Sequence, residues 1–317
     1  MNSSTLNKRI RLVITGVVQG VGFRPFVYQT ALKYSLNGYV LNNGNGVVIE
    51  IEGMQNSIAL FLEDLKEKNP PLSRIDSINS ENLELKDTQE FSIIESNNTN
   101  VNTMVSPDIS MCEDCKSEMN DPKNRRYQYP FINCTNCGPR YTIVDSLPYD
   151  RKNTSMKNFE MCSECSTEYK NPLDRRFHAQ PVSCYKCGPK LHLVPENAIN
   201  ANNELESLVD SIESGKTVAL KGIGGFHIIC DATNEKAVEI LRENKNRPTK
   251  PFAVMFYDID AVREVADLSK EDEALILSKE RPIVVVSQKE DSILASSIAP
   301  GIDRVGVFLA YSPLHEL

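Results

Sequence analysis

The chain of 317 residues lacks any uninterrupted apolar run of about 20 residues, the length that a membrane-spanning helix needs. Its first residues, Met1 to Lys8, also lack the apolar core of a secretory signal peptide. There is no excess of positive charge: 35 Lys and Arg against 43 Asp and Glu give a formal net charge of −8. An acidic chain is a poor candidate for non-specific binding to duplex nucleic acid or anionic membrane. We therefore expect a cytoplasmic protein with no membrane partner and no nucleic-acid ligand.

Cysteine is almost absent outside one part of the chain. Eight of the nine cysteines lie between Cys112 and Cys187, and the ninth, Cys230, stands alone. In a reducing cytoplasm, clustered cysteines are more often metal ligands than disulfide partners. Cys230 has no partner nearby in the sequence with which it could bind a metal, so we expect it to be buried and to fill space in an apolar core.

The length predicts two or three domains. Residues 96–103 are polar and uncharged, which is typical of a linker, and a second break falls at 195–203. We therefore divide the chain into three segments, at about 1–95, 106–194 and 204–317.

The first segment alternates strand and helix signals. Alternating or apolar runs predict strands, and apolar residues at helical spacing predict helices. Asn42 to Asn45 is a hairpin signal between two of these strands. The expected strands are 9–15, 38–41, 46–52 and 91–94, and the expected helices are 23–36 and 55–68. The order βαββαβ predicts a ferredoxin-like α/β sandwich.

The middle segment is a duplicated unit in which every cysteine recurs at an offset of 50. Each unit has the form Cys-x2-Cys-x18-Cys-x2-Cys, and two such knuckles complete a tetrahedral four-sulfur zinc site. With no free ligand position, the two zinc sites should be structural. The duplication favours sequential sites, although a crossed pairing satisfies the same spacing. The sequential ligand sets are Cys112, Cys115, Cys134 and Cys137, then Cys162, Cys165, Cys184 and Cys187.

Zinc fingers also raise the possibility of nucleic-acid binding, and Arg125-Arg126 and Arg175-Arg176 are local basic spots. Residues 106–190 carry 13 basic and 11 acidic side chains, a formal charge of +2. Eight thiolates and two Zn²⁺ ions change this by −4, to about −2. This balance favours a scaffold that joins two domains.

The third segment, 204–317, also alternates helix and strand signals. We expect helices at 204–214 and 235–242, and strands at 217–220, 251–256 and 282–286, the last two fully buried. The alternation predicts a mixed sheet covered by helices.

A glycine-rich turn follows the first expected strand, in the string Gly16-Val-Val-Gln-Gly-Val-Gly-Phe-Arg-Pro-Phe26. Such a turn brings successive backbone N–H groups together, and the following helix N-terminus adds positive partial charge. Arg24 can then donate two hydrogen bonds to phosphate oxygens. A tight turn with a surface arginine fits the same residues equally well.

The whole string resembles the acylphosphatase signature, and Gly38-Tyr-Val-Leu-Asn42 resembles that family's second motif. The resemblance implies that Asn42, rather than its neighbour Asn43, orients the attacking water. It also implies that a phosphoryl group is bound by the loop residues Gln19, Gly20, Val21, Gly22, Phe23 and Arg24. Such a site needs no strong base, because it positions water and stabilises developing charge.

Nearly the whole chain resembles the HypF carbamoyltransferase family of nickel–iron hydrogenase maturation. The order of an acylphosphatase motif, a doubled four-cysteine unit and Lys221-Gly-Ile-Gly-Gly-Phe-His227 is typical of that family. Further matching strings are Arg175-Arg-Phe-His-Ala-Gln180, Cys230-Asp-Ala-Thr-Asn234 and Lys250-Pro-Phe-Ala-Val-Met255.

This resemblance implies a reaction sequence that starts from carbamoyl phosphate. The acylphosphatase-like domain releases carbamate, and a YrdC-like domain combines it with ATP, carried with Mg, to give carbamoyl adenylate. A further domain passes the carbamoyl group to the C-terminal cysteine of HypE for cyanide ligand synthesis. In the third segment, the residues where the family gathers charge for the nucleotide are Lys221, Lys245, Arg247 and Lys250. His227 fits either a site residue or a packed core histidine.

The chain ends at Tyr311-Ser-Pro-Leu-His-Glu-Leu317, which resembles a string from the middle of the family's YrdC-like domain. We therefore expect an incomplete YrdC-like domain and expect transfer to HypE to require residues outside this chain. Two other hypotheses remain open. One is a zinc-scaffolded module that binds RNA or protein without catalysis, and the other is a generic acylphosphatase that acts equally on many acyl phosphates.

Overall fold

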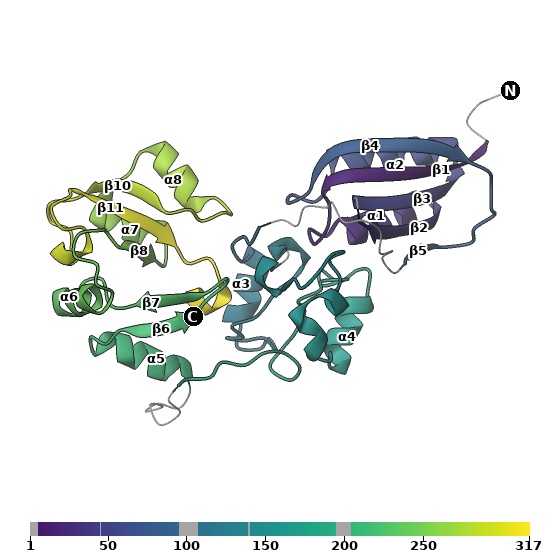
Figure 1. Cartoon of the computed structure of the whole chain (residues 1–317). Helices are drawn as coiled ribbons and strands as arrows, with labels where there is room; N and C mark the ends of the chain where they lie inside the picture. Colours follow the sequence, from purple (N-terminus) through teal and green to yellow (C-terminus); the bar gives the residue numbers. More distant parts are fainter. Residues whose placement is uncertain (1–5, 45, 95–106, 139, 195–203) are drawn as a thin grey trace.

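The computed structural model describes residues 6–44, 46–94, 107–138, 140–194 and 204–317. Three parts follow one another along the chain, and the cysteine-rich part lies between the other two (Figure 1). The linkers expected at 96–103 and 195–203 lie outside the described residues. We call the three parts the N-terminal part, the finger part and the C-terminal part.

The N-terminal part is a five-stranded sheet with two helices. Neighbouring strands are antiparallel except for β2 and β5, which pair in parallel, and the strand order is β4-β1-β3-β2-β5. The elements in chain order are β1 (Asn7–Val17), α1 (Phe23–Lys33), β2 (Asn37–Asn43), β3 (Gly46–Met54), α2 (Gln55–Glu67), β4 (Arg74–Leu83) and β5 (Phe91–Ile93). This arrangement confirms the ferredoxin-like fold class.

Alternating apolar residues fix which face of this sheet is buried. Ile10, Leu12 and Ile14 of β1 are buried and lie opposite Ile51, Ile49 and Val47 of β3. Since side chains alternate across a strand, this register places all six on one face, where α1 and α2 cover them. The hairpin between β2 and β3 follows from the same register, with Asn43 paired to Gly46.

One strand of this sheet was not expected from the sequence. The strand predicted at 91–94 is the short β5, whereas the long fourth strand is β4. β4 lies at the sheet edge, pairs only with β1, and is mostly polar and exposed. The pattern that identifies half-buried strands is therefore weak in β4.

The finger part contains little regular structure. Its two short helices, α3 (Glu113–Asn120) and α4 (Ser163–Lys170), each begin directly after the first cysteine of a unit. The duplication extends to unusual backbone: Gln128 and His178, which are 50 residues apart, have positive φ values of 54° and 53°. Apolar residues such as Met119, Tyr129 and Ile132 pack with the cysteines into a small core.

The C-terminal part contains a mixed sheet of order β8-β11-β10-β9 and a separate hairpin, β6-β7, so the expected mixed sheet is confirmed. The strands predicted as fully buried alternate instead between buried and exposed positions; Ile283 and Val285, for example, are exposed. The elements are α5 (Glu204–Glu213), β6 (Val218–Lys221), β7 (Phe226–Ile229), α6 (Glu235–Asn244), β8 (Ala253–Phe256), α7 (Ile259–Val265), β9 (Ala266–Asp267), α8 (Lys270–Leu277), β10 (Val284–Gln288), β11 (Arg304–Leu309) and α9 (Pro313–Glu316).

The finger part also contacts the end of the chain. The N–H of Met111 donates to the carbonyl of Tyr311 at 3.1 Å, and Lys116 of α3 forms an ion pair with Glu316 of α9 at 2.8 Å.

Among the described residues, no helix is both long enough and apolar enough to cross a membrane.

Candidate active site and metal centres

The loop between β1 and α1 presents its backbone to a cavity at the border with the finger part. Val18, Val21 and Phe23 are buried in the core. The cavity is lined by Val18, Gly20 and Gly22 of the loop and by Phe23 and Arg24 at the start of α1. Gly22 is the N-cap of α1 at φ 75°, a conformation that favours glycine. A Cβ on Gly22 would lie 3.3 Å from the Cβ of Thr135, beside the zinc ligand candidate Cys134. The loop thus combines a helix N-terminus, exposed backbone and an arginine, as an anion site requires.

Arg24 and Asn42 meet although they come from different elements. Arg24 lies in the first turn of α1 and Asn42 near the end of β2, and both are buried. In the amide orientation that satisfies both groups, Asn42 Oδ1 accepts hydrogen bonds from Nε and Nη2 of Arg24, each at 3.3 Å. The neighbouring Asn43 forms the last pair of the β2–β3 ladder with Gly46.

Gln19 has a linking role in this loop. Its Nε2 donates to the carbonyls of Asn43 and Gly46 at 2.9 and 2.8 Å, and its Oε1 accepts from the N–H of Tyr149 at 3.2 Å. The Gln19 side chain therefore joins the loop between β1 and α1 both to the β2–β3 hairpin and to the finger part. Neither Gln19 nor Val21 is among the residues that line the cavity.

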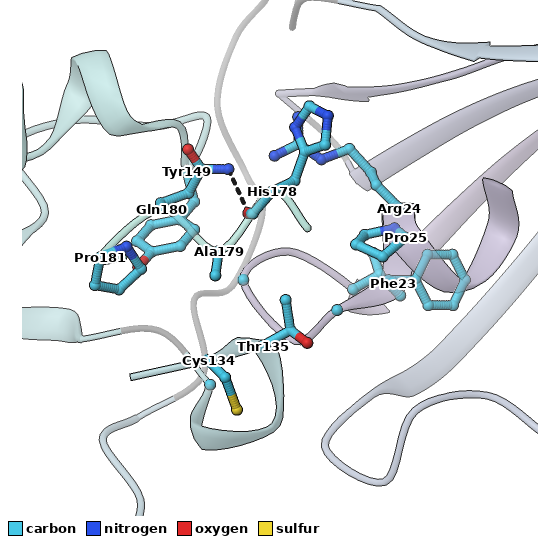
Figure 2. Close-up of a pocket in the computed structure, with 14 residues that line it drawn as sticks. Phe23, Arg24, Pro25, Cys134, Thr135, Tyr149, His178, Ala179, Gln180 and Pro181 are labelled. Atoms are coloured by element: carbon cyan, nitrogen blue, oxygen red, sulfur yellow. Dashed lines mark hydrogen bonds between the residues drawn. The ribbon is translucent and has the colours of Figure 1, made fainter. Parts of the chain in front are cut away.

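The finger part forms the opposite wall of this cavity. Figure 2 shows Thr135, Tyr149 and the run from His178 to Pro181 facing the loop that carries Arg24. Asp150, next to Tyr149, accepts a hydrogen bond from Arg24 Nη2 at 2.9 Å. The cavity measures about 20 Å³, which is room for about one water molecule. The site is therefore enclosed by two parts of the chain.

His178 is neutral at physiological pH in this wall. Burial and the positive charge of Arg24 lower the pKa of His178 to about 4, while Asp150 acts in the opposite direction. The side chain packs against the rings of Phe177 and Tyr169, and its carbonyl accepts from Gln180 Nε2 at 2.7 Å. His178 therefore offers the cavity an uncharged imidazole.

The eight clustered cysteines form two separate groups. In each group the four Sγ atoms lie within 4.8 Å of one another, and neighbouring Sγ atoms are 3.4 to 3.9 Å apart. Zn–S bonds of about 2.3 Å place the sulfurs of a tetrahedral site about 3.8 Å apart, so both groups fit zinc. The pairing is sequential: Cys112, Cys115, Cys134 and Cys137 form one group, and Cys162, Cys165, Cys184 and Cys187 form the other.

The two metal centres are joined by crossed ion pairs. Arg125 and Arg126 of the first unit pair with Glu168 of the second, and Arg126 Nη2 also donates to Cys165 Sγ at 3.4 Å. Arg175 and Arg176 of the second unit pair with Glu118 of the first, which lies 50 residues before Glu168, and Arg175 Nη1 donates to Cys115 Sγ at 3.0 Å. Each unit therefore supplies hydrogen bonds to a metal ligand of the other, which helps to hold thiolate charge.

These contacts change the interpretation of the arginine pairs as basic surface spots. The side chains of Arg126 and Arg176 are only 2% and 4% exposed, and both point inward to a glutamate. Their Nε atoms donate to the carbonyls of Ser183 and Asn133, in the other unit. Buried, paired arginines are unavailable to phosphates, so the RNA-binding hypothesis loses its main support.

A second cavity, of about 850 Å³, lies between the finger part and the C-terminal part. Lys245 and Arg247 line it, whereas Lys221 and Lys250 are not among its lining residues. His227 also lines it, with Nε2 3.2 Å from the Tyr311 hydroxyl, so it is not a fully packed core histidine. Cys230 is half-buried rather than buried, and it packs against the core of the C-terminal part.

No role was assigned from the sequence to the finger residues around Arg24, although His178 and Gln180 lie in the family-matching string Arg175–Gln180. His178 and Gln180 stand where the first unit has Gln128 and Pro130, so a break in the duplication was the available signal. Glu118 and Glu168 recur at the offset of 50, as structural partners should. Asp150 lies between the units and in no motif, and nothing local connects it with Arg24, which is 126 residues away.

Three family models match the chain. The acylphosphatase model matches residues 10–93, and the HypF finger model matches 111–144 and 161–194. The Sua5/YciO/YrdC model, described as telomere recombination, matches residues 210–317. The acylphosphatase of Bacillus licheniformis is 40% identical over 85 residues, which cover 26% of this chain and 93% of that protein. The N-terminal part therefore belongs to the acylphosphatase family.

The similarity to longer proteins extends over nearly the whole chain. The carbamoyltransferase HypF of Rhizobium leguminosarum is 50% identical over 310 residues, which cover 98% of this chain and 39% of that protein. A crystal structure of full-length HypF in a phosphate- and nucleotide-bound form matches with a TM-score of 0.94 and 47% identity, over 98% of this chain and 41% of that one. The chain thus spans about two fifths of the length of these HypF relatives. It belongs to the HypF carbamoyltransferase family, an enzyme family in which it carries the acylphosphatase, finger and Sua5/YciO/YrdC-type regions.

Proposed function

We propose that the N-terminal part hydrolyses carbamoyl phosphate to carbamate and orthophosphate, as the first step of a hydrogenase-maturation carbamoyltransferase. The observation that carries this proposal is the meeting of Arg24 and Asn42 beside the glycine loop, with Asn42 Oδ1 3.3 Å from two guanidinium nitrogens. Both residues lie within the range 10–93 that the acylphosphatase model matches, which supports the proposal.

In the proposed reaction the backbone N–H groups of residues 19–23 and the Arg24 guanidinium hold the phosphoryl oxygens. Asn42 Nδ2 donates to a water molecule and aligns it with phosphorus. The water attacks phosphorus, the P–O bond to carbamate breaks, and the water proton passes to solvent or to the product oxygens. Pre-arranged donors stabilise the charge on the phosphoryl group, so the chemistry requires no strong base.

Carbamate would next meet ATP, with Mg, in the C-terminal part. Lys245 and Arg247 line the large cavity there, and Arg247 Nε is buried without a hydrogen-bond partner among the described residues. A buried, unpaired donor is expensive, and a phosphate oxygen of the nucleotide would satisfy it. We place Lys221 and Lys250 at the margin of the same nucleotide site. The carbamoyl group would then be transferred to the C-terminal cysteine of HypE.

The finger part would serve as a zinc-bound scaffold. It contacts the N-terminal part through Asp150 and Tyr149 and the C-terminal part through Lys116 and Met111. Because free carbamate is labile, a fixed distance between the two sites would favour its use over its loss. We place this chemistry in the cytoplasm.

The test is orthophosphate release from carbamoyl phosphate by the zinc-loaded chain, compared with Arg24→Ala and Asn42→Ala. We expect wild-type turnover and a loss of about 100-fold or more in each variant, as for the removal of one oxyanion donor. Equal rates in all three proteins would reject the proposal. Hydrolysis of benzoyl phosphate distinguishes this proposal from a generic acylphosphatase. The finger residues that line the cavity should exclude the larger benzoyl group, whereas a generic enzyme would hydrolyse both substrates.

A further inference from the structure

The contact between Arg24 and Asp150 places a carboxylate where the reaction needs a phosphate. The Arg24 side chain is 8% exposed and that of Asp150 is 15% exposed, so solvent screens this pair little. Arg24 Nη2 donates to Asp150 Oδ1 at 2.9 Å and lies 3.3 Å from Asn42 Oδ1. The phosphate-binding arginine is therefore already partnered by an anion from another part of the chain.

Asp150 is held in this place by its neighbours. The guanidinium of Arg151 donates to the carbonyls of Gln180 and Val182 at 2.7 and 2.9 Å, and to that of Phe159 at 2.8 Å. On the other side, the N–H of Tyr149 donates to Gln19. Because the backbone is fixed on both sides, the carboxylate near Arg24 is a built feature of the interface rather than a surface contact.

A phosphoryl group cannot share this space with the Asp150 carboxylate as it stands. The cavity beside Arg24 holds about one water molecule. A phosphate dianion next to an ionised carboxylate also meets like-charge repulsion in a poorly solvated site. Phosphate binding must therefore separate Arg24 from Asp150. The free energy of that separation reduces the affinity for phosphate.

We propose that Asp150 is a resident counter-anion at Arg24, which the phosphoryl group displaces, and that it weakens the hold of the site on phosphate. Asp150 is then a positioning residue that acts through Arg24 and touches no reacting atom. It lowers affinity for substrate and product together, which favours release of orthophosphate after hydrolysis. The inference rests on the proposed function, because it takes Arg24 as the phosphoryl-binding group.

The test is calorimetric titration of the zinc-loaded chain with inorganic phosphate. Asp150→Asn keeps the shape and an acceptor oxygen but removes the charge, and we expect phosphate to bind about tenfold more tightly. KM for carbamoyl phosphate should fall in the same direction, and kcat should not rise. A merely structural role would weaken binding, so the sign of the change is diagnostic.

Asp145→Asn is the matched control. It removes the same charge from the same part of the chain, at a half-exposed aspartate paired with Lys157, and it should leave phosphate affinity unchanged. Asp150→Ser is a second charge-removing variant, and a content of two zinc ions checks that the finger part is folded in each protein.

Two results would overturn the inference. If Arg24→Ala abolishes phosphate binding but Asp150→Asn and Asp150→Ser bind phosphate no more tightly than Asp145→Asn does, the counter-anion role is wrong and the proposed function stands. If Arg24→Ala leaves phosphate binding intact, Arg24 is not the phosphate ligand and both proposals fail.

Discussion

Glu168 provides a direct test of how the two metal centres support each other. Its carboxylate, though partly buried, has a pKa lowered to about 2, because hydrogen bonds from Arg126 and Arg125 outweigh the effect of burial. Glu168→Ala would leave Arg126, 2% exposed at its side chain, as a buried cation without its counter-ion. Breaking a buried pair in this way costs about 3–5 kcal/mol. Arg126 keeps its bonds to the Ser183 carbonyl and Cys165 Sγ, so we expect the lower end, about 3 kcal/mol.

The assay is the release of zinc to a chelator, together with urea denaturation monitored by the fluorescence of the tyrosines in the finger part. A loss of about 3 kcal/mol corresponds to about 100-fold in the opening equilibrium, so zinc should leave Glu168→Ala far faster than the wild type. The rate of zinc release from Glu168→Gln should lie between those of the wild type and Glu168→Ala, because glutamine keeps a hydrogen-bond acceptor but carries no charge. Glu160→Ala is the control, since Glu160 is an exposed glutamate close to the same unit. If Glu168→Ala releases zinc no faster than Glu160→Ala, the crossed pairs do not stabilise the centres.

Two further predictions concern metal content and pH. Metal analysis should give two zinc ions per chain, and a wild-type protein that binds one zinc or none would contradict the double site. Cys134→Ser should lose one zinc ion at once. It should also weaken zinc binding at the other site, through Arg175 and Glu118. The pKa of His178 is about 4 in the folded chain against about 6.5 unfolded, so the unfolded state binds more protons between these values and stability falls as pH drops through this range. Urea denaturation at pH 7 and 5.5 should show that wild type loses about 1 kcal/mol more than His178→Gln, and identical losses would show that His178 is not buried as neutral imidazole.

The sequence was a good guide wherever function or folding depends on local pattern. The alternation in β1 and the helical spacing in α2 predicted the main elements of the N-terminal part, because each has one buried face. The cysteine spacing predicted two four-sulfur sites, since two residues between ligands bring both thiols to one ion, and the duplication favoured the sequential ligand sets that the structure has. β4 was missed because an exposed edge strand needs no apolar face.

The contacts that join the parts could not be predicted from such patterns. Arg24 and Asp150 are 126 residues apart, and an aspartate between two repeats has no local feature that names its partner. The arginine pairs looked like basic surface because charge in a sequence does not indicate burial. Only the packing of one unit against the other turns them toward Glu118 and Glu168. The contacts between the parts therefore consist of long-range pairs that periodicity does not encode.

In the proposed reaction, Arg24 and Asn42 direct water onto the phosphorus of carbamoyl phosphate. The most direct measurement is hydrolysis in ¹⁸O-labelled water, with the orthophosphate analysed by mass spectrometry. We expect one ¹⁸O atom in each phosphate released by the wild-type chain, and only the spontaneous background of phosphate release with Arg24→Ala or Asn42→Ala. Unlabelled phosphate from the wild-type chain would mean that the C–O bond on the carbamoyl side is cleaved, which would contradict water attack on phosphorus.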